Sequence, residues 1–212
     1  AEALIDEVLK SDPNDEGANR IKATIDFEQK EYQTAAGFYA KVPDDFLEIE
    51  DFINIAKINL AMGDTVKAFT VFDKAAVLDP EEDRIFFEKG KVYLAQKNYS
   101  DAVTSFDKAI AMNTPNVTVY FAKGVAQYQD KKLDDATATF NALLQKDPTY
   151  ALGYFYIGVI AYDKRKEAVN ANNAADADKY KEEAIKNFTK VLELEPENAD
   201  AKSFMNALQS AP

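Results

Sequence analysis

The fold is decided by residues 83–116, which read DRIFFEKGKVYLAQKNYSDAVTSFDKAIAMNTPN. The following stretch, residues 117–150, reads VTVYFAKGVAQYQDKKLDDATATFNALLQKDPTY. Both stretches have glycine at the eighth position, alanine at the twentieth and phenylalanine at the twenty-fourth. Self-similarity at a fixed period of about 20–50 residues is the signature of a repeat architecture. The chain is therefore expected to be built from stacked repeats.

The same period extends along most of the chain. Its members are the alanines Ala1, Ala35, Ala68, Ala102, Ala136 and Ala184, the glycines Gly90, Gly124 and Gly158, the phenylalanines Phe72, Phe106, Phe140 and Phe188, and the prolines Pro80, Pro148 and Pro196. Successive alanines are 33 or 34 residues apart, except that Ala184 follows Ala136 by 48. Because several residue types share one period, chance is a poor explanation for it.

Each period is expected to contain two helices. Gly90 and Tyr93 share one face of the first helix, and Ala102 and Phe106 share one face of the second, with the polar residues 96–98 between them. The prolines of the pattern end the second helices, because a residue that precedes proline is pushed out of the helical region. Two helices joined by a short turn form an antiparallel hairpin.

The recurring small residues predict close helix packing. Glycine inside a helix costs about 1 kcal/mol relative to alanine, so Gly90, Gly124 and Gly158 need a structural reason. We expect them to face the alanines of the paired helix, and we expect the recurring phenylalanines to fill space toward the next hairpin.

This pattern resembles the tetratricopeptide repeat family, whose motif is a 34-residue helix–turn–helix with small residues on the facing sides, an aromatic residue in the second helix and a closing proline. The resemblance implies an all-α fold, a right-handed α-solenoid of antiparallel helix pairs. It predicts one domain over residues 1–212, with a half repeat at 1–15, repeats at 16–48, 49–82, 83–116, 117–150 and 151–198, and a capping helix at 199–212. The motif is specific for fold and nearly silent on ligand.

Three places depart from the regular pattern. Pro43 arrives early in the repeat at 16–48, so the helix joint near residues 42–46 is irregular. The last repeat has 14 extra residues, which predicts that each of its helices is two turns longer. The half repeat lacks its first helix, which predicts that further protein or another chain covers this end, unless the lone helix packs adequately on residues 16–41.

A second face of each first helix is expected to line the inner curve of the solenoid. The candidate peptide-binding residues on this face are Phe87, Lys91, Phe121, Tyr128, Phe155, Tyr162, Lys57 and Arg84. Aromatic anchors with a few cations dominate interfaces of this kind, so the hypothesis is a groove that binds a peptide with an apolar part and an acidic group. The alternative is that the phenylalanines pack between neighbouring first helices.

Composition excludes other functions. The net charge of −12, with 25 basic and 37 acidic residues, argues against nucleic acid. The chain has no Cys and no His, which removes thiolate chemistry, the commonest general base and the commonest metal ligand. Acidic runs such as Asp134-Asp135 fall at expected helix starts, where they complement the helix dipole. We therefore expect no enzyme activity, no cofactor, no metal and no transmembrane segment.

The sequence favours a non-catalytic interaction module or scaffold that binds a protein or peptide partner. The alternative is an accessory domain of a larger protein or assembly, which could be exported or periplasmic. Self-association through the incomplete amino end is a further hypothesis. The compartment stays open, because cytoplasmic, periplasmic and secreted proteins can all lack Cys.

Overall fold

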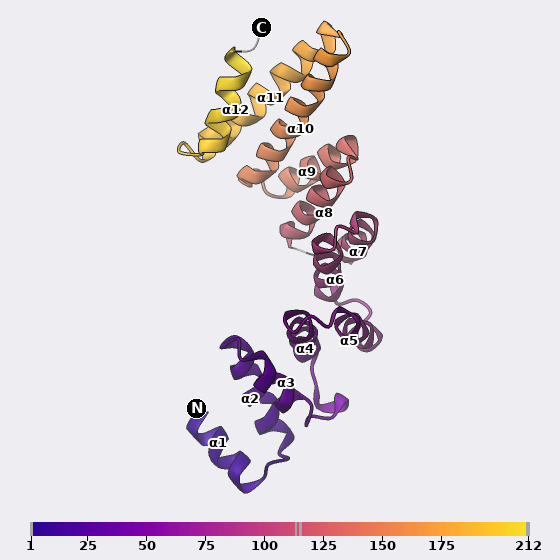
Figure 1. Cartoon of the computed structure of the whole chain (residues 1–212), viewed down its shortest axis with the longest axis vertical. Coiled ribbons are helices and arrows are strands. Elements are labelled where there is room, and N and C mark those ends of the chain that lie inside the picture. The colour runs from indigo at the N-terminus through magenta and orange to yellow at the C-terminus, as the bar shows by residue number, and fades with distance from the viewer. Residues whose placement is uncertain (1, 113, 115, 211–212) are drawn as a thin grey trace. The chain divides into compact units, whose positions relative to one another are not determined.

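The computed structural model describes residues 2–112, 114 and 116–210, and all regular structure in that part of the chain is helical (Figure 1). The all-α class is therefore confirmed. The chain divides into two compact units, the first ending at Lys89 and the second beginning at Gly90, within helix α6 (Asp83–Ala95). Each unit is described by itself, and the prediction of one continuous domain stays a prediction.

The described residues of the first unit form five α-helices, one 3-10 helix and the start of α6. Its elements are α1 (Glu2–Ser11), α2 (Glu16–Glu28), α3 (Tyr32–Tyr39), the 3-10 helix η1 (Asp44–Phe46), α4 (Ile49–Ala61) and α5 (Thr65–Leu78). The second unit continues from α6 through α7 (Tyr99–Ala111), α8 (Val117–Gln129), α9 (Leu133–Lys146), α10 (Ala151–Asn170), α11 (Ala174–Leu194) and α12 (Ala199–Ser210). Helices α8 and α9, and helices α10 and α11, are packed as pairs.

The turns inside the hairpins use left-handed residues. Their backbone φ angles are 64° at Lys30, 83° at Gly63, 59° at Lys97, 63° at Lys131 and 54° at Asn172. A left-handed residue just after a helix lets the chain reverse while its amide still bonds the helix end. Glycine adopts this conformation without cost, whereas lysine does not, so the three lysine turns are held by the helices on either side.

The second helices stop where the sequence predicts. Helix α5 ends at Leu78, and α9 ends at Lys146, each followed by an extended Asp before proline. Helix α11 ends at Leu194, before Glu195 and its proline. The proline rings thus set the ends of these three helices.

The recurring glycines face aromatic rings, which corrects the expectation that they face alanines. A Cβ atom on Gly90 would lie 2.4 Å from the ring of Phe106, and a Cβ on Gly124 would lie 2.6 Å from the ring of Phe140. The rings are fully buried. The phenylalanines therefore fill space inside their own hairpin first, because only glycine leaves room for a ring against the backbone.

The last hairpin has lengthened helices. Helix α10 has 20 residues against 13 in α8, and α11 has 21 against 14 in α9. Each helix thus gains seven residues, about two turns, and the two run alongside each other (Figure 1). The irregular joint lies at η1, after which α4 begins at Ile49.

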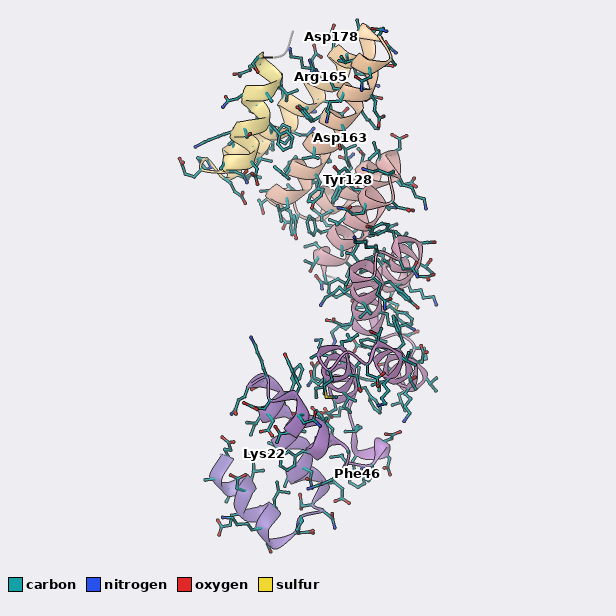
Figure 2. The ribbon with its side chains drawn as sticks, in the orientation of Figure 1. Lys22, Phe46, Tyr128, Asp163, Arg165 and Asp178 are labelled. Carbon is teal, nitrogen blue, oxygen red and sulfur yellow. The ribbon has the colours of Figure 1, made fainter. Side chains whose placement is uncertain are left out.

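The two ends of the described chain differ. Helix α1 has no buried residue, and its Leu4 and Val8 are exposed. Lys22 of α2 (labelled in Figure 2) forms an ion pair of 2.6 Å with Glu2 of α1. Self-association through this end stays a prediction. Helix α12 buries Ala201 and Leu208, and its role as a capping helix stays a prediction. Residues 211–212 lie outside the described residues.

We predict that Gly124→Ala destabilises the protein by about 1–3 kcal/mol, the usual cost of overpacking, although alanine favours helix. The added methyl group would collide with the buried ring of Phe140. Urea denaturation followed by circular dichroism measures the free energy of unfolding.

The matched control is Gly37→Ala, in helix α3. A Cβ atom there meets nothing within 4 Å, so this substitution should be neutral or stabilising by up to about 1 kcal/mol. Equal effects of the two substitutions would contradict the proposed role of the glycine.

Candidate functional site

The candidate site in the second unit is one face of helices α8 and α10. Phe121, Val125 and Tyr128 follow each other on α8 at steps of four and three residues, so they share one side of the helix. Phe155, Val159 and Tyr162 repeat this order on α10. All six side chains are half-buried. The face is therefore apolar, aromatic and partly open to solvent.

Phe121 is held by three rings, one from α9, one from α10 and one from the residue that caps the start of α10. Its ring centroid lies 6.1 Å from that of Phe140, 5.6 Å from Tyr150 and 5.5 Å from Tyr156. Edge-to-face and tilted ring pairs at such distances add about 0.5–1.5 kcal/mol each beyond area burial. Phe121 thus contributes to packing and keeps a partly exposed edge.

Phe155 and Tyr162 are packed against the last helix. Phe204 of α12 lies 6.0 Å from Phe155 and 5.1 Å from Tyr162, ring centroid to centroid, and it stacks on the buried Phe188 at 4.8 Å. Helix α12 therefore covers one side of these two rings. From the sequence, Phe155 could either anchor a ligand in a groove or pack inside the protein. In the structure both Phe155 and Tyr162 pack against neighbouring rings, and both stay half-buried.

Leu152 extends this face and was missed from the sequence. It stands three residues before Phe155 on α10, and its side chain is 43% exposed. The helical step would have found it, because Leu152, Phe155, Val159 and Tyr162 are separated by three, four and three residues. It is the most exposed apolar side chain among these residues. We call the set Leu152, Phe121, Val125, Tyr128, Phe155, Val159 and Tyr162 the aromatic face.

A polar group closes one end of the aromatic face. The Tyr128 hydroxyl donates a hydrogen bond of 2.8 Å to the Asp163 carboxylate (Figure 2). Burial, with help from the neighbouring Asp163, raises the pKa of Tyr128 to about 12. The Lys131 ammonium lies 5.7 Å from the Tyr128 ring centroid, and the Lys166 ammonium lies 5.8 Å from that of Tyr162. Two cations therefore lie beside the aromatic face. The sequence predicts binding cations only in the amino-terminal half of the chain.

The predicted cations of the first unit are already paired. Lys57 lies 3.4 Å from the carboxylate of Glu88. Arg84 is bound by Glu50 at 2.5 Å and by Glu82 at 2.8 Å. A cation that is neutralised by its own chain attracts an acidic ligand less strongly, so these two residues give limited support to the predicted recognition of an acidic group.

Phe87 and Lys91 lie on helix α6, one on each side of the boundary between the units. Phe87 is half-buried, and Lys91 is exposed. The structure therefore groups Lys57, Arg84 and Phe87 in the first unit and the remaining predicted residues in the second.

Arg20 has a structural role in the first unit. Its guanidinium Nε donates to Asp51 at 2.6 Å, and the Asp51 side chain is only 4% exposed. Asp51 also accepts from the Glu48 amide at 2.8 Å and from the Tyr39 hydroxyl at 3.3 Å. This arrangement satisfies a buried carboxylate at the start of α4.

Comparisons with known proteins agree with this architecture. Residues 87–151 match the family model of the tetratricopeptide repeat. Among curated proteins none matches the sequence.

Solved structures share the fold at low sequence identity. The C-terminal part of a tetratricopeptide repeat-containing protein from Cytophaga hutchinsonii is 18% identical, with a TM-score of 0.72 over 96% of this chain and 93% of that one. YrrB, described as a tetratricopeptide repeat protein with an unusual peptide-binding site, is 18% identical, with a TM-score of 0.69 over 96% of this chain and 98% of that one. The first repeat domain of Spaghetti, bound to an HSP90 peptide, is 24% identical, with a TM-score of 0.51 over 62% of this chain and 93% of that one.

The fold and the comparisons together define the class of this protein as an α-helical repeat solenoid. Residues 87–151 match the tetratricopeptide repeat model, and the solved structures that share the fold are tetratricopeptide repeat proteins, which agrees with the resemblance seen in the sequence.

No helix in the described part of the chain is both long enough and apolar enough to cross a membrane. Within the same residues, no group of three or more acidic side chains is arranged to hold a metal ion.

We predict that Arg20→Met destabilises the protein by about 3 kcal/mol, because it leaves the buried Asp51 carboxylate without its charge partner. Lys57→Met is the control, since the pair of Lys57 with Glu88 is longer and more exposed and should cost less than about 1 kcal/mol. Urea denaturation measures both. Equal small losses would contradict a structural role for Arg20.

We predict that Tyr128 titrates near pH 12 instead of 10. Between these pH values the unfolded tyrosine loses its proton while the folded one keeps it, so the stability that Tyr128 contributes is present below pH 10 and is lost as pH rises toward 12. The difference in tyrosinate absorbance between wild type and Tyr128→Phe isolates this residue. A midpoint near 10 would refute the prediction.

In Asp163→Asn the midpoint of Tyr128 should fall but stay above 10, because burial is the largest cause of the shift.

Proposed function

We propose that this protein is a non-catalytic interaction module that binds a peptide segment on the aromatic face of helices α8 and α10. Tetratricopeptide repeats are in general interaction modules without catalytic activity, and the match of residues 87–151 to their family model supports this broad class. The single observation that carries the peptide proposal is the row of half-buried rings continued by the exposed Leu152.

The chemistry of the aromatic face supports an apolar anchor on the ligand. Partly buried aromatic side chains offer large contact areas and lose little conformational freedom on binding. Lys131 and Lys166 stand beside the rings, so an acidic group on the peptide would meet cations at this end of the face. Asp163 is already engaged by Tyr128.

Two similar structures support a peptide ligand by analogy. YrrB is described as having an unusual peptide-binding site, and the first repeat domain of Spaghetti is bound to a peptide of HSP90. These two proteins are 18% and 24% identical to this chain. The analogy therefore concerns only the kind of ligand, a peptide, and says nothing of the peptide's sequence. The role as an accessory domain of a larger protein stays a prediction.

The test uses a displayed library of random short peptides, selected on the purified protein. Enriched peptides should share an aromatic or aliphatic residue, and Leu152→Asp should weaken their binding about tenfold, the effect of about 1.4 kcal/mol. Fluorescence anisotropy measures the dissociation constants. Leu152 is the cleaner probe, because Phe121 and Phe155 also make ring contacts inside the unit.

Val66→Asp provides a control in the first unit. Val66 is 78% exposed and lies on helix α5, outside the aromatic face. It should leave binding unchanged. Failure to enrich any peptide, or equal losses in the two variants, would overturn the proposal.

A further inference from the structure

The first unit contains an apolar cleft that the proposed function does not use. The cleft has a volume of about 640 Å³ and lies between η1 and the second half of α5. Its lining residues are Asp44, Asp45, Phe52, Thr70, Asp73, Lys74, Val77 and Leu78. A smaller cavity of about 310 Å³ adjoins it, and Asp44, Phe52 and Lys74 line both. We call the larger cavity the α5 cleft.

The α5 cleft exists because helix α3 is short. Helix α3 has 8 residues, whereas the second helices α5, α7 and α9 have 14, 13 and 14. The early Pro43 is extended, at φ −61° and ψ 148°, and introduces η1 in place of further helical turns. The end of α5 therefore borders a loop where a regular repeat would continue with helix.

Two large apolar side chains of the cleft lining are exposed. Val77 is 79% exposed and Leu78 is 60% exposed. Phe46, the last residue of η1, is 54% exposed and lies outside the lining (Figure 2). Neighbouring apolar groups exposed in this way mark interaction sites more often than isolated ones do.

The repeat pattern does not require apolar residues here. The positions equivalent to Val77 in the next three second helices hold Ala111, Gln145 and Glu193. Since these helices occupy the same place in their own hairpins, a polar residue is compatible with the fold at this position. The exposed valine is thus a feature of this hairpin.

The charges around the α5 cleft are mainly negative. Its lining contains three carboxylates and one ammonium, the latter paired with Asp44 at 2.8 Å. Asp73 is paired with Lys89 at 2.6 Å. Within the described part of the chain Asp45 has no ion-pair partner and is exposed.

The end of helix α5 adds to this negative field. The last turn of a helix carries partial negative charge, which basic residues usually complement. Helices α7 and α9 have Lys108 and Lys146 in their last turns, whereas α5 has no basic residue there and is followed by Asp79.

We propose that the α5 cleft binds a basic amphipathic segment of a partner protein, whose apolar side chains contact Val77 and Leu78 and whose Lys or Arg side chains face Asp45 and the end of α5. Complementary charge selects this occupant. A second copy of the chain is disfavoured, because a two-fold contact through this cleft would bring two acidic rims together on molecules of net charge −12.

The test uses three short synthetic amphipathic helices with the same leucine face and an opposite face of Lys, Glu or Gln. The Lys peptide should bind the intact protein most tightly, with amide chemical shifts changing at residues 44–46 and 70–78. Added salt should weaken it. Equal binding of the Lys and Gln peptides, or shifts confined to other residues, would overturn the proposal.

Matched variants separate the cleft from general attraction to an acidic protein. Val77→Gln should weaken the Lys peptide about tenfold, an effect of about 1.4 kcal/mol, since it removes an apolar contact. Val66→Gln should have no effect, because Val66 is 78% exposed on the same helix but does not line the cleft. Both side chains are exposed, so folding should be unchanged, and equal thermal melting verifies this.

Charge and self-association are tested in the same format. Asp45→Lys should weaken the Lys peptide at least fivefold and leave the melting temperature unchanged, because Asp45 is exposed. Analytical ultracentrifugation tests the second copy. A dimer of the wild type that Val77→Gln dissociates would overturn the proposal in favour of self-association.

Discussion

The structure depends on one contact, the burial of a phenylalanine ring of a second helix against a glycine of the first. The ring can reach the backbone only because glycine has no Cβ, and a methyl group at Gly124 would lie 2.6 Å from Phe140. This contact sets how closely the two helices of a hairpin approach. The other side of the phenylalanine ring contacts a ring of the element that follows. Phe140 stacks on Tyr156 at 5.2 Å, and Phe188 stacks on Phe204 at 4.8 Å, ring centroid to centroid. One ring therefore joins its own hairpin to the next element.

The same packing explains why the aromatic face is only partly open. Phe121 packs against the buried ring of Phe140, and Phe155 packs against the buried ring of Phe188. Because part of each ring is covered in this way, neither can be a fully exposed anchor for a ligand. Their remaining exposed edges, together with Leu152, offer a rigid apolar face with little conformational freedom to lose on binding. In the first unit the corresponding helices carry cations, and Arg20, Lys57 and Arg84 are bound to carboxylates of the chain. The two units thus offer different chemistry on equivalent helix faces.

Much of the candidate site follows from helical spacing, and the rest does not. Phe121, Tyr128, Phe155 and Tyr162 are found by a step of 34 residues and by helical periodicity, and the same steps reach Leu152. The pairing of Arg20 with Asp51 joins residues 31 positions apart, so it depends on how α2 meets α4. The α5 cleft is equally hidden, because it results from a missing length of α3 beside a complete α5.

By itself the sequence determined the repeat length, the helix pairs, the proline-defined ends of the second helices and the long last hairpin, because these depend on local spacing and on the backbone limits of proline. The tertiary structure decided what the glycines face, which cations are neutralised and which apolar residues stay exposed. It also holds Lys97 and Lys131 in left-handed turns that lysine does not favour alone. These features depend on contacts between residues far apart in the chain, whose geometry is set only when the helices pack.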